Sequence, residues 1–186
     1  GDNPFLRKAD AGYEKRLKLL SPTDRKALLD GVWELNEGQY FSEFSRDLHV
    51  VKPYAIPHDW RRCLTIDYGL DMLAALWIAQ SPDGHSVVYR ELYRPGLIIS
   101  DAAAQMLACE TAGERIDCRL APPDLWNRRQ ETGRSAVELF ADSGLDFVKS
   151  SNERVAGWLA LHELLMPRKD TDGAVRPRLT IFDTCR

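Results

Sequence analysis

The 186-residue sequence contains no apolar run that approaches the roughly 18 to 20 residues of a membrane-spanning helix. Its first residues also lack the basic segment followed by an apolar segment that is typical of a secretory signal peptide. From these two absences we expect a soluble, intracellular protein without a membrane partner.

Cysteine is scarce, and its spacing carries no motif. The four cysteines are Cys63, Cys109, Cys118 and Cys185, and no two of them form a CxxC pair of the kind that binds zinc. Their separations also do not resemble the dense framework of a small disulfide-rich protein. We therefore expect four reduced thiols, most of them buried.

An excess of positive charge is also missing, because 25 Lys and Arg residues are outweighed by 28 Asp and Glu residues, for a formal net charge of -3. No overall basic field indicates a polyanionic partner, so any nucleic-acid binding must come from a local patch. The sequence has no GxxxxGK[ST] motif either, and we expect no ATP hydrolysis by this chain.

Residues 1–55 and 56–186 differ in pattern. The apolar residues Tyr13, Leu17 and Leu20 follow helical spacing, and Ser21-Pro22 begins a second short helix that ends near Gly31. An aromatic-rich segment without regular periodicity follows. We interpret residues 1–55 as a helical tail and an irregular connector, and residues 56–186 as one globular domain, which this length and 44% hydrophobic content can support.

The second part alternates between strands and helices. Period-2 alternation and short turns predict three consecutive antiparallel strands, and helix caps predict the helices that follow. The last helix should bury a stripe made of Val155, Trp158, Leu159, His162 and Leu165. The predicted elements are strands over 62–68, 72–79 and 86–94, a helix from a Ser100 cap to about 110, a strand over 116–120, a helix over 135–144, a strand over 145–149, a helix over 153–166 and a strand over 178–183.

Two aspartates lie where predicted strands end. Asp67 ends the first strand, and Asp124 follows the Pro122-Pro123 pair that stops the fourth. A carboxylate at a strand end is held by a rigid sheet and can face a groove, which suits a metal ligand. Both residues also have a simpler interpretation, Asp67 as an ordinary turn residue and Asp124 as the cap of the Leu125-Trp126 turn.

The order of elements is that of the RNase H fold, and the chain resembles the nuclease domain of the large terminase subunit of tailed phages. The segments that carry this resemblance are Asp2-Asn3-Pro4-Phe5, Leu28-Leu29-Asp30-Gly31-Val32-Trp33, Gly38-Gln39-Tyr40-Phe41, Asp67-Tyr68-Gly69, Glu91-Leu92-Tyr93, Ala121-Pro122-Pro123-Asp124-Leu125-Trp126 and Ser151-Asn152-Glu153-Arg154-Val155-Ala156-Gly157-Trp158. The resemblance implies an α/β fold with an RNase H-like mixed sheet, an antiparallel three-strand meander plus two parallel strands, and flanking helices. Residues 1–55 would then be the tail of an upstream ATPase domain and its connector.

The resemblance implies a two-metal endonuclease that cuts concatemeric double-stranded DNA during genome packaging in the bacterial host. Acids of the sheet and of one late helix would bind Mg²⁺ or Mn²⁺, hard cations that prefer oxygen ligands. Asp67 matches the first acid. The family's Ala-Asp-Pro segment reads Ala121-Pro122-Pro123 here, so the second role passes to Asp124; Asp71 and Glu91 are possible accessory ligands or ordinary surface acids.

The third acid of the family lies in an Asp-His-x-x-Asp-Ala-Leu type of helix, and this sequence stops before any such segment. Asp183 on the last predicted strand is a poor substitute. We therefore expect this chain to be truncated, and inactive or weak as a nuclease. In the full-length protein, the resemblance implies the small terminase subunit and the portal as further partners.

A local basic patch would bind the DNA backbone. Five cations are candidates because they follow Asp124 or flank the start of the last long helix: Arg128, Arg129, Arg134, Lys149 and Arg154. Alternatively, these cations belong to a solvated loop and pair with Glu131 and Glu138.

Two other classes remain open from the sequence. RNase H-like domains can lose their acids and persist as DNA-binding or docking modules, because a fold does not dictate a function. Another nuclease of the same fold group, such as a transposase or a RuvC-type resolvase, is the second alternative. The aromatic connector over 32–44 favours a terminase over both.

Overall fold

The computed structural model describes residues 40–169 and 173–185. Residues 46–186 form a compact unit of their own, and all that follows concerns this unit. The two helices predicted before residue 31 and most of the aromatic connector lie outside the described residues. In the described part, no helix has both the length and the apolar character that crossing a membrane requires.

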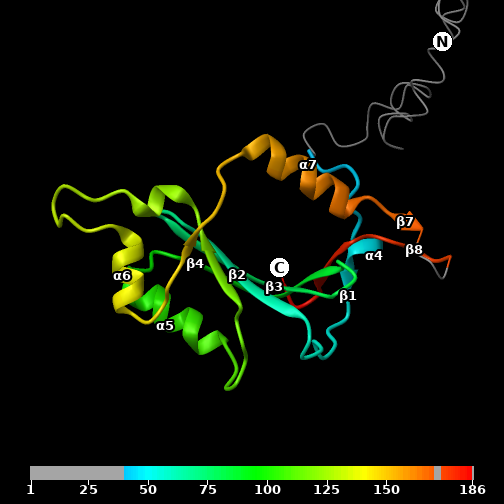
Figure 1. Ribbon diagram of the computed structural model, residues 1–186, viewed down its shortest axis with the longest axis horizontal. Helices are drawn as coiled ribbons and strands as arrows, with labels where there is room; N and C mark the ends of the chain where they lie inside the picture. The colour runs from blue at the N-terminus through cyan, green and yellow to red at the C-terminus, as the bar shows by residue number, and fades with distance from the viewer. Residues whose placement is uncertain (1–39, 170–172, 186) are drawn as a thin grey trace, which may run out of the picture. The chain divides into compact units, whose positions relative to one another are not determined.

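A seven-stranded mixed sheet forms the centre of the unit, in the order β1-β9-β4-β3-β2-β5-β6. Figure 1 shows the long strands β2, β3 and β4 at its centre. The predicted antiparallel meander is confirmed as β2, β3 and β4. The two parallel strands that the resemblance implies are β5, which pairs with β2, and β6, which pairs with β5. At the other edge, β9 lies parallel to β4, and β1 pairs with β9. The strands are β1 (Val50–Val51), β2 (Arg61–Tyr68), β3 (Met72–Gln80), β4 (Ser86–Pro95), β5 (Cys118–Ala121), β6 (Val148–Lys149) and β9 (Leu179–Phe182).

One face of the sheet carries the main core. Leu64 and Ile66 of β2 point to this face together with Trp77 of β3, and all three are buried. Helices α5 (Ile99–Cys109) and α6 (Ala136–Asp142) cover it, contributing Met106 and Phe140. The alternation of these residues along the strands is the period-2 pattern from which the strands were predicted.

The two covering helices begin in different ways. The predicted capping box at α6 is confirmed, since the Ser135 hydroxyl accepts from the Glu138 N–H and the Glu138 carboxylate accepts from the Ser135 N–H. The predicted Ser100 cap of α5 is wrong. The cap position is Ile98, without a side-chain hydrogen bond, because the helix already starts at Ile99, whose side chain is buried in the core.

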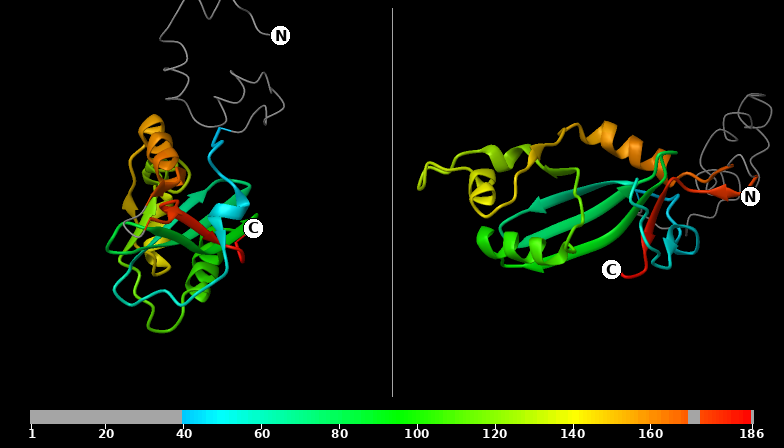
Figure 2. Two further views of the ribbon diagram at one scale, coloured as in Figure 1. Left: turned by 90° about the vertical axis from the view of Figure 1, so that its right-hand side faces the viewer. Right: turned by 60° about the horizontal axis from the view of Figure 1, so that its bottom comes forward.

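Helix α7 (Arg154–Leu165) lies on the side of the sheet away from α5 (Figure 2). Two hydrogen bonds attach this region to the rest of the unit. Before the helix, the Ser150 N–H donates to the Ala121 carbonyl at 2.9 Å, and at its end the buried His49 Nε2 donates to the Leu165 carbonyl at 2.9 Å. His49 belongs to the short helix α4 (Arg46–His49). A small hairpin of β7 (Arg168–Lys169) and β8 (Val175–Arg176), which the sequence did not predict, follows α7.

The predicted buried stripe of α7 is wrong. The exposed fractions are 66% for Val155, 42% for Trp158 and 59% for Leu159, His162 is half-buried, and only Leu165 lies in a buried position. The physical reason is that the helix is attached at its ends rather than laid on the sheet. Helical spacing of apolar residues identifies an apolar face but not the surface that covers it.

The expectation of four reduced thiols is also wrong, because Cys63 and Cys118 form a disulfide with 4.8 Å between their Cα atoms. The parallel register of β2 and β5 places these two residues directly opposite each other. Nothing in a separation of 55 residues reveals that register. Cys109 and Cys185 are free and half-buried.

Reduction of this disulfide is expected to lower the free energy of unfolding by about 2–4 kcal/mol, since the bond closes a long loop in the unfolded chain. The measurement is urea unfolding with and without dithiothreitol. In Cys63→Ser the reductant should have no further effect, whereas Cys109→Ser should keep the full response. Four titratable thiols in the unfolded, unreduced protein would contradict the bond.

Candidate active site

Asp67 lies one residue before the end of β2, on the face of the sheet away from α5. Its neighbours in sequence, Ile66 and Leu64, alternate onto the buried face, so the Asp67 side chain points the other way and is exposed. The register places Ala74 of β3 beside Asp67, and Tyr93 of β4 beside Ala74. Asp67 thus belongs to a row of side chains on the open face.

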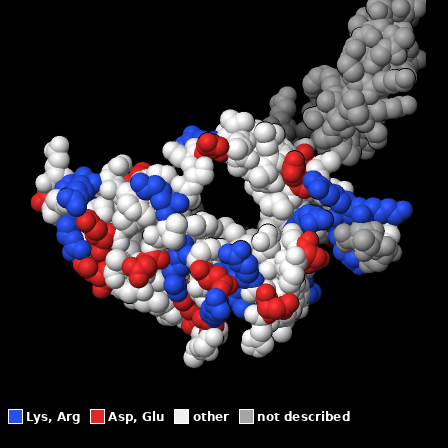
Figure 3. Space-filling view, in the orientation of Figure 1, with Lys and Arg blue, Asp and Glu red and all other residues white. Residues whose placement is uncertain are grey.

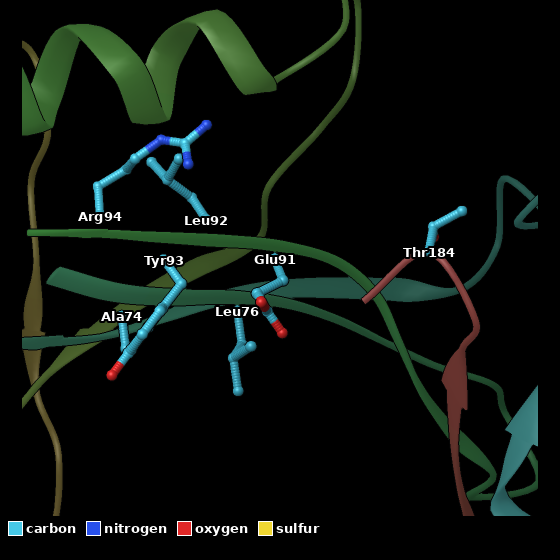
Figure 4. Close-up of a pocket in the computed structure, with 7 residues that line it drawn as sticks. All are labelled: Ala74, Leu76, Glu91, Leu92, Tyr93, Arg94 and Thr184. Atoms are coloured by element: carbon cyan, nitrogen blue, oxygen red, sulfur yellow. The ribbon is translucent and has the colours of Figure 1, made fainter. Parts of the chain in front are cut away.

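A hollow of about 810 Å³ lies along this row. Figure 4 shows Ala74, Leu76, Glu91 and Tyr93 on one side of the sheet, with Leu92 and Arg94 on the other side. Thr184, near the end of the chain, lines the same hollow. Figure 3 shows open space between α7 and the sheet on this side.

The two proposed accessory acids lie in different settings. Glu91 is half-buried and shares the open face with Asp67, but β3 separates its strand from β2. Asp71 lies in the turn between β2 and β3, where its backbone carbonyl accepts from the Gly96 N–H at 3.1 Å. Only Glu91 therefore shares a sheet face with Asp67.

Asp124 follows β5, the parallel neighbour of β2, in keeping with the element order of the family that the sequence resembles. Leu120 pairs with Thr65, so the same register carried two residues further would bring Pro122, not an acid, beside Asp67. The strand ends at Ala121 because the two prolines cannot donate to a ladder, and Pro123 begins a 3-10 helix. The strand therefore stops at the two prolines as predicted, and Asp124 lies just after it, within this short helix.

Asp124 is exposed and lines a cavity of about 480 Å³ together with Asn127, Arg128 and Arg129. The cavity opens between the turn after β2, the loop before α5 and the segment after the 3-10 helix. An acid and two cations therefore meet in one opening next to the end of the strand that carries Asp67.

The predicted basic residues divide into paired and unpaired groups. Residues 128–135 form a hairpin-like loop, in which the Arg129 N–H donates to the Arg134 carbonyl at 3.1 Å. Arg128 lies 3.5 Å from the Glu138 carboxylate, and Arg134 lies 2.6 Å from that of Asp142. The alternative of a loop with internal ion pairs thus holds for these two, with Asp142 as a second partner.

The remaining cations have no carboxylate partner within the described residues. They are Arg129, Lys149 and Arg154; Lys149 lies 5.1 Å from the centre of the Trp126 ring, and Arg154 is the exposed first residue of α7. In Figure 3, Lys and Arg side chains alternate with acidic ones over the end of the molecule that holds α6 and this loop.

Asp67 and Asp124 supply carboxylate oxygens, the donors that Mg²⁺ and Mn²⁺ prefer. In the described part of the chain, however, no three acidic, His or Cys side chains converge on one point. The donor chemistry therefore fits a divalent cation, but the number of converging ligands is too small for a complete two-metal site.

Sequence reasoning missed a buried carboxylate beside the sheet. Glu114, in the loop after α5, accepts from the Tyr89 hydroxyl at 2.8 Å, from Arg90 at 3.0 Å, and from the Thr111 N–H and hydroxyl, each at 2.9 Å. Burial alone would raise the pKa of Glu114, but these hydrogen bonds outweigh it and lower the pKa to about 2. No local pattern signals this network, because it joins β4 to a distant loop.

Comparison with known proteins rests on structure alone, because no family model and no curated protein matches the sequence. The nuclease domain of the P22 large terminase superimposes with a TM-score of 0.60 over 81% of this chain and 75% of that chain, at 16% identity. The chain has the fold of a terminase nuclease domain. The RNase H-like mixed sheet implied by the resemblance is thereby confirmed.

Two other solved structures, each from a thermophilic phage, share this terminase nuclease fold. A large terminase in complex with ADP matches 97% of this chain with a TM-score of 0.63 at 15% identity, and this chain spans only 42% of that protein. The large terminase nuclease of phage G20c with bound magnesium matches 80% of this chain and 76% of that chain, with a TM-score of 0.50 at 15% identity.

Proposed function

We propose that this chain is the nuclease part of a phage or prophage large terminase subunit and cuts concatemeric double-stranded DNA with Mg²⁺ or Mn²⁺. The observation that carries the proposal is the placement of Asp67 near the end of β2 and of Asp124 shortly after its parallel neighbour β5, in a sheet with the terminase nuclease fold. The magnesium bound in the G20c nuclease adds support for a divalent cation in a domain of this fold.

In this proposal, Asp67 and Asp124 hold the cations, and Glu91 or Asp71 contributes through water. A cation bound there would polarise the phosphodiester and lower the pKa of an attacking water. The rigid sheet fixes Asp67, while Arg128, Arg129 and Arg134 of the hairpin-like loop, with Lys149 and Arg154, position the backbone phosphates without reading base sequence.

The site needs a third carboxylate, and we propose that a segment beyond Arg186 supplies it in the full-length protein. The hollow along the open face supports this, because Thr184 lines it next to Glu91 and Leu76. The boundary between connector and nuclease domain at residues 55 and 56 stays a prediction, although Val50–Val51 already pairs with the sheet.

The cellular setting follows only from the proposed family. It comprises the bacterial cytoplasm and, for the full-length protein, the small terminase subunit and the portal as partners. A docking module without catalysis is the second candidate, and the observation that favours it is the lack of three converging ligands in the described residues. The structures compared above are terminases and lend no support to a transposase or RuvC-type resolvase.

Extending the chain past Arg186 to restore the third acid is expected to produce metal-dependent cleavage of double-stranded DNA with little sequence preference. The present chain should bind Mn²⁺ weakly and cut little, since fewer carboxylates mean lower affinity for a hard cation. Plasmid nicking with Mg²⁺, Mn²⁺ or EDTA measures this. An extended protein that folds and binds DNA but cuts with neither metal would instead support the docking module.

A further inference from the structure

Two aliphatic side chains project into solvent at the end of the sheet where Asp67 lies. Leu70, in the turn between β2 and β3, is 94% exposed, and Ile98, in the loop before α5, is 64% exposed. Single exposed apolar residues are common on protein surfaces and need no explanation. These two differ because they line the same cavity.

The backbone that carries them is held by hydrogen bonds. The Gly96 N–H donates to the Asp71 carbonyl at 3.1 Å, which joins the loop to the turn, and the Tyr68 hydroxyl donates to the Leu97 carbonyl at 2.8 Å. The Tyr68 ring packs edge-on against the buried Phe140, with 5.3 Å between ring centres. The turn is thus tied to the core, so ordering Leu70 against a ligand costs little conformational entropy.

The surroundings of the pair are polar and include two arginines and one acid. The 480 Å³ cavity that Leu70 and Ile98 line is also lined by Asp124, Asn127, Arg128 and Arg129. Arg129 has no carboxylate partner within the described residues, and it lines the next cavity as well, beside Ile98 and Tyr68. Aliphatic side chains such as Leu70 and Ile98, placed next to guanidinium groups, match a ligand whose apolar surface lies between phosphates.

We propose that Leu70, with Ile98 beside it, inserts against the base stack of the bound duplex and opens a base step while the neighbouring arginines hold the phosphates. Proteins that bend DNA use apolar wedges of this kind, inserted from the minor groove. The inference rests on the proposed function and adds to it the way in which the duplex is held. Unstacking a base step at this turn would bend the DNA backbone next to Asp67.

The test uses this 186-residue chain and a short duplex with 2-aminopurine at a TA step, the type of step that unstacks most easily. Binding should raise the 2-aminopurine fluorescence by about twofold or more as the base leaves the stack. Leu70→Ser should remove this rise and weaken binding by about tenfold to a hundredfold, the effect expected for losing one buried aliphatic side chain. Leu70→Met should retain the rise.

Leu159→Ser is the matched control, because Leu159 is also an exposed leucine but lies on α7. It should behave as the unchanged protein does. Duplex binding without a rise in fluorescence, or a full rise with Leu70→Ser, would overturn this inference and leave the nuclease proposal standing. Absence of any duplex binding at low salt would overturn both.

Discussion

Replacing Asp67 with asparagine in the extended protein is expected to reduce DNA cleavage at least about a thousandfold, because metal-ion stabilisation of the transition state is worth several kcal/mol and each 1.36 kcal/mol is tenfold in rate. The substitution keeps the shape of the side chain and removes the negative charge that would hold the cation. Asp67 lies on a strand paired on both sides, so the backbone around it should not move. The measurement is plasmid cleavage with saturating Mn²⁺.

A DNA-binding measurement distinguishes the loss of a metal ligand from the loss of the fold as the cause of lost cleavage. The Asp67→Asn protein should bind duplex DNA as tightly as before or slightly more tightly, since a charge that repels phosphate is gone. Asp59→Asn, at an exposed acid before β2, is the control and should cut normally. Equal cutting by the Asp67→Asn protein would show that the active site lies elsewhere.

Replacing Glu114 with alanine is expected to lower the free energy of unfolding by about 3–5 kcal/mol, as for removal of one partner of a buried ion pair. The Glu114 carboxylate is buried against Arg90 and accepts hydrogen bonds from Tyr89 and Thr111. Its loss leaves these donors without their acceptor. Urea unfolding at pH 7 measures the change. Glu131→Ala, in the exposed loop, should change it little, and an equal loss there would contradict the role of the network.

The same network should make the protein acid-sensitive. The pKa of Glu114 falls from the ordinary 4.5 to about 2 in the folded state, so its contribution to stability is present above about pH 4.5 and is lost as the pH drops toward 2. After allowance for solvent screening, we expect a loss of about 1–2 kcal/mol over this range. Glu114→Gln should flatten this part of the stability profile. An unchanged profile would mean that other carboxylates cause the acid sensitivity.

Local patterns were enough to predict the elements that depend on near neighbours in sequence. The meander follows from alternation in β2 and from the short turns on either side of β3. The capping box of Ser135 and Glu138 follows from a spacing of three residues. The placement of β5 beside β2 came from the resemblance to a known element order, and it also holds.

Features that depend on contacts between residues far apart in the sequence could not be predicted from it. The Cys63–Cys118 bond requires the register of two strands, and the exposure of Trp158 requires knowledge of where α7 is attached. For the candidate site, Asp67 was placed correctly at the end of a strand, whereas Asp124 lies in a 3-10 helix that the two prolines produce. Sequence alone gave no sign that Leu70 shares a cavity with Arg129.

The pairing of β2 with β5 also bears on how this sheet assembles. Strands β2, β3 and β4 are joined by short turns, so they can pair at a small cost in loop-closure entropy. Strand β5 must return across β3, β4 and α5 before Cys118 meets Cys63, and such non-local pairing is slow. The Cys63–Cys118 disulfide can therefore form only once β5 has paired with the meander of β2, β3 and β4. A chain without this pairing has not yet brought the end of β5 beside the end of β2.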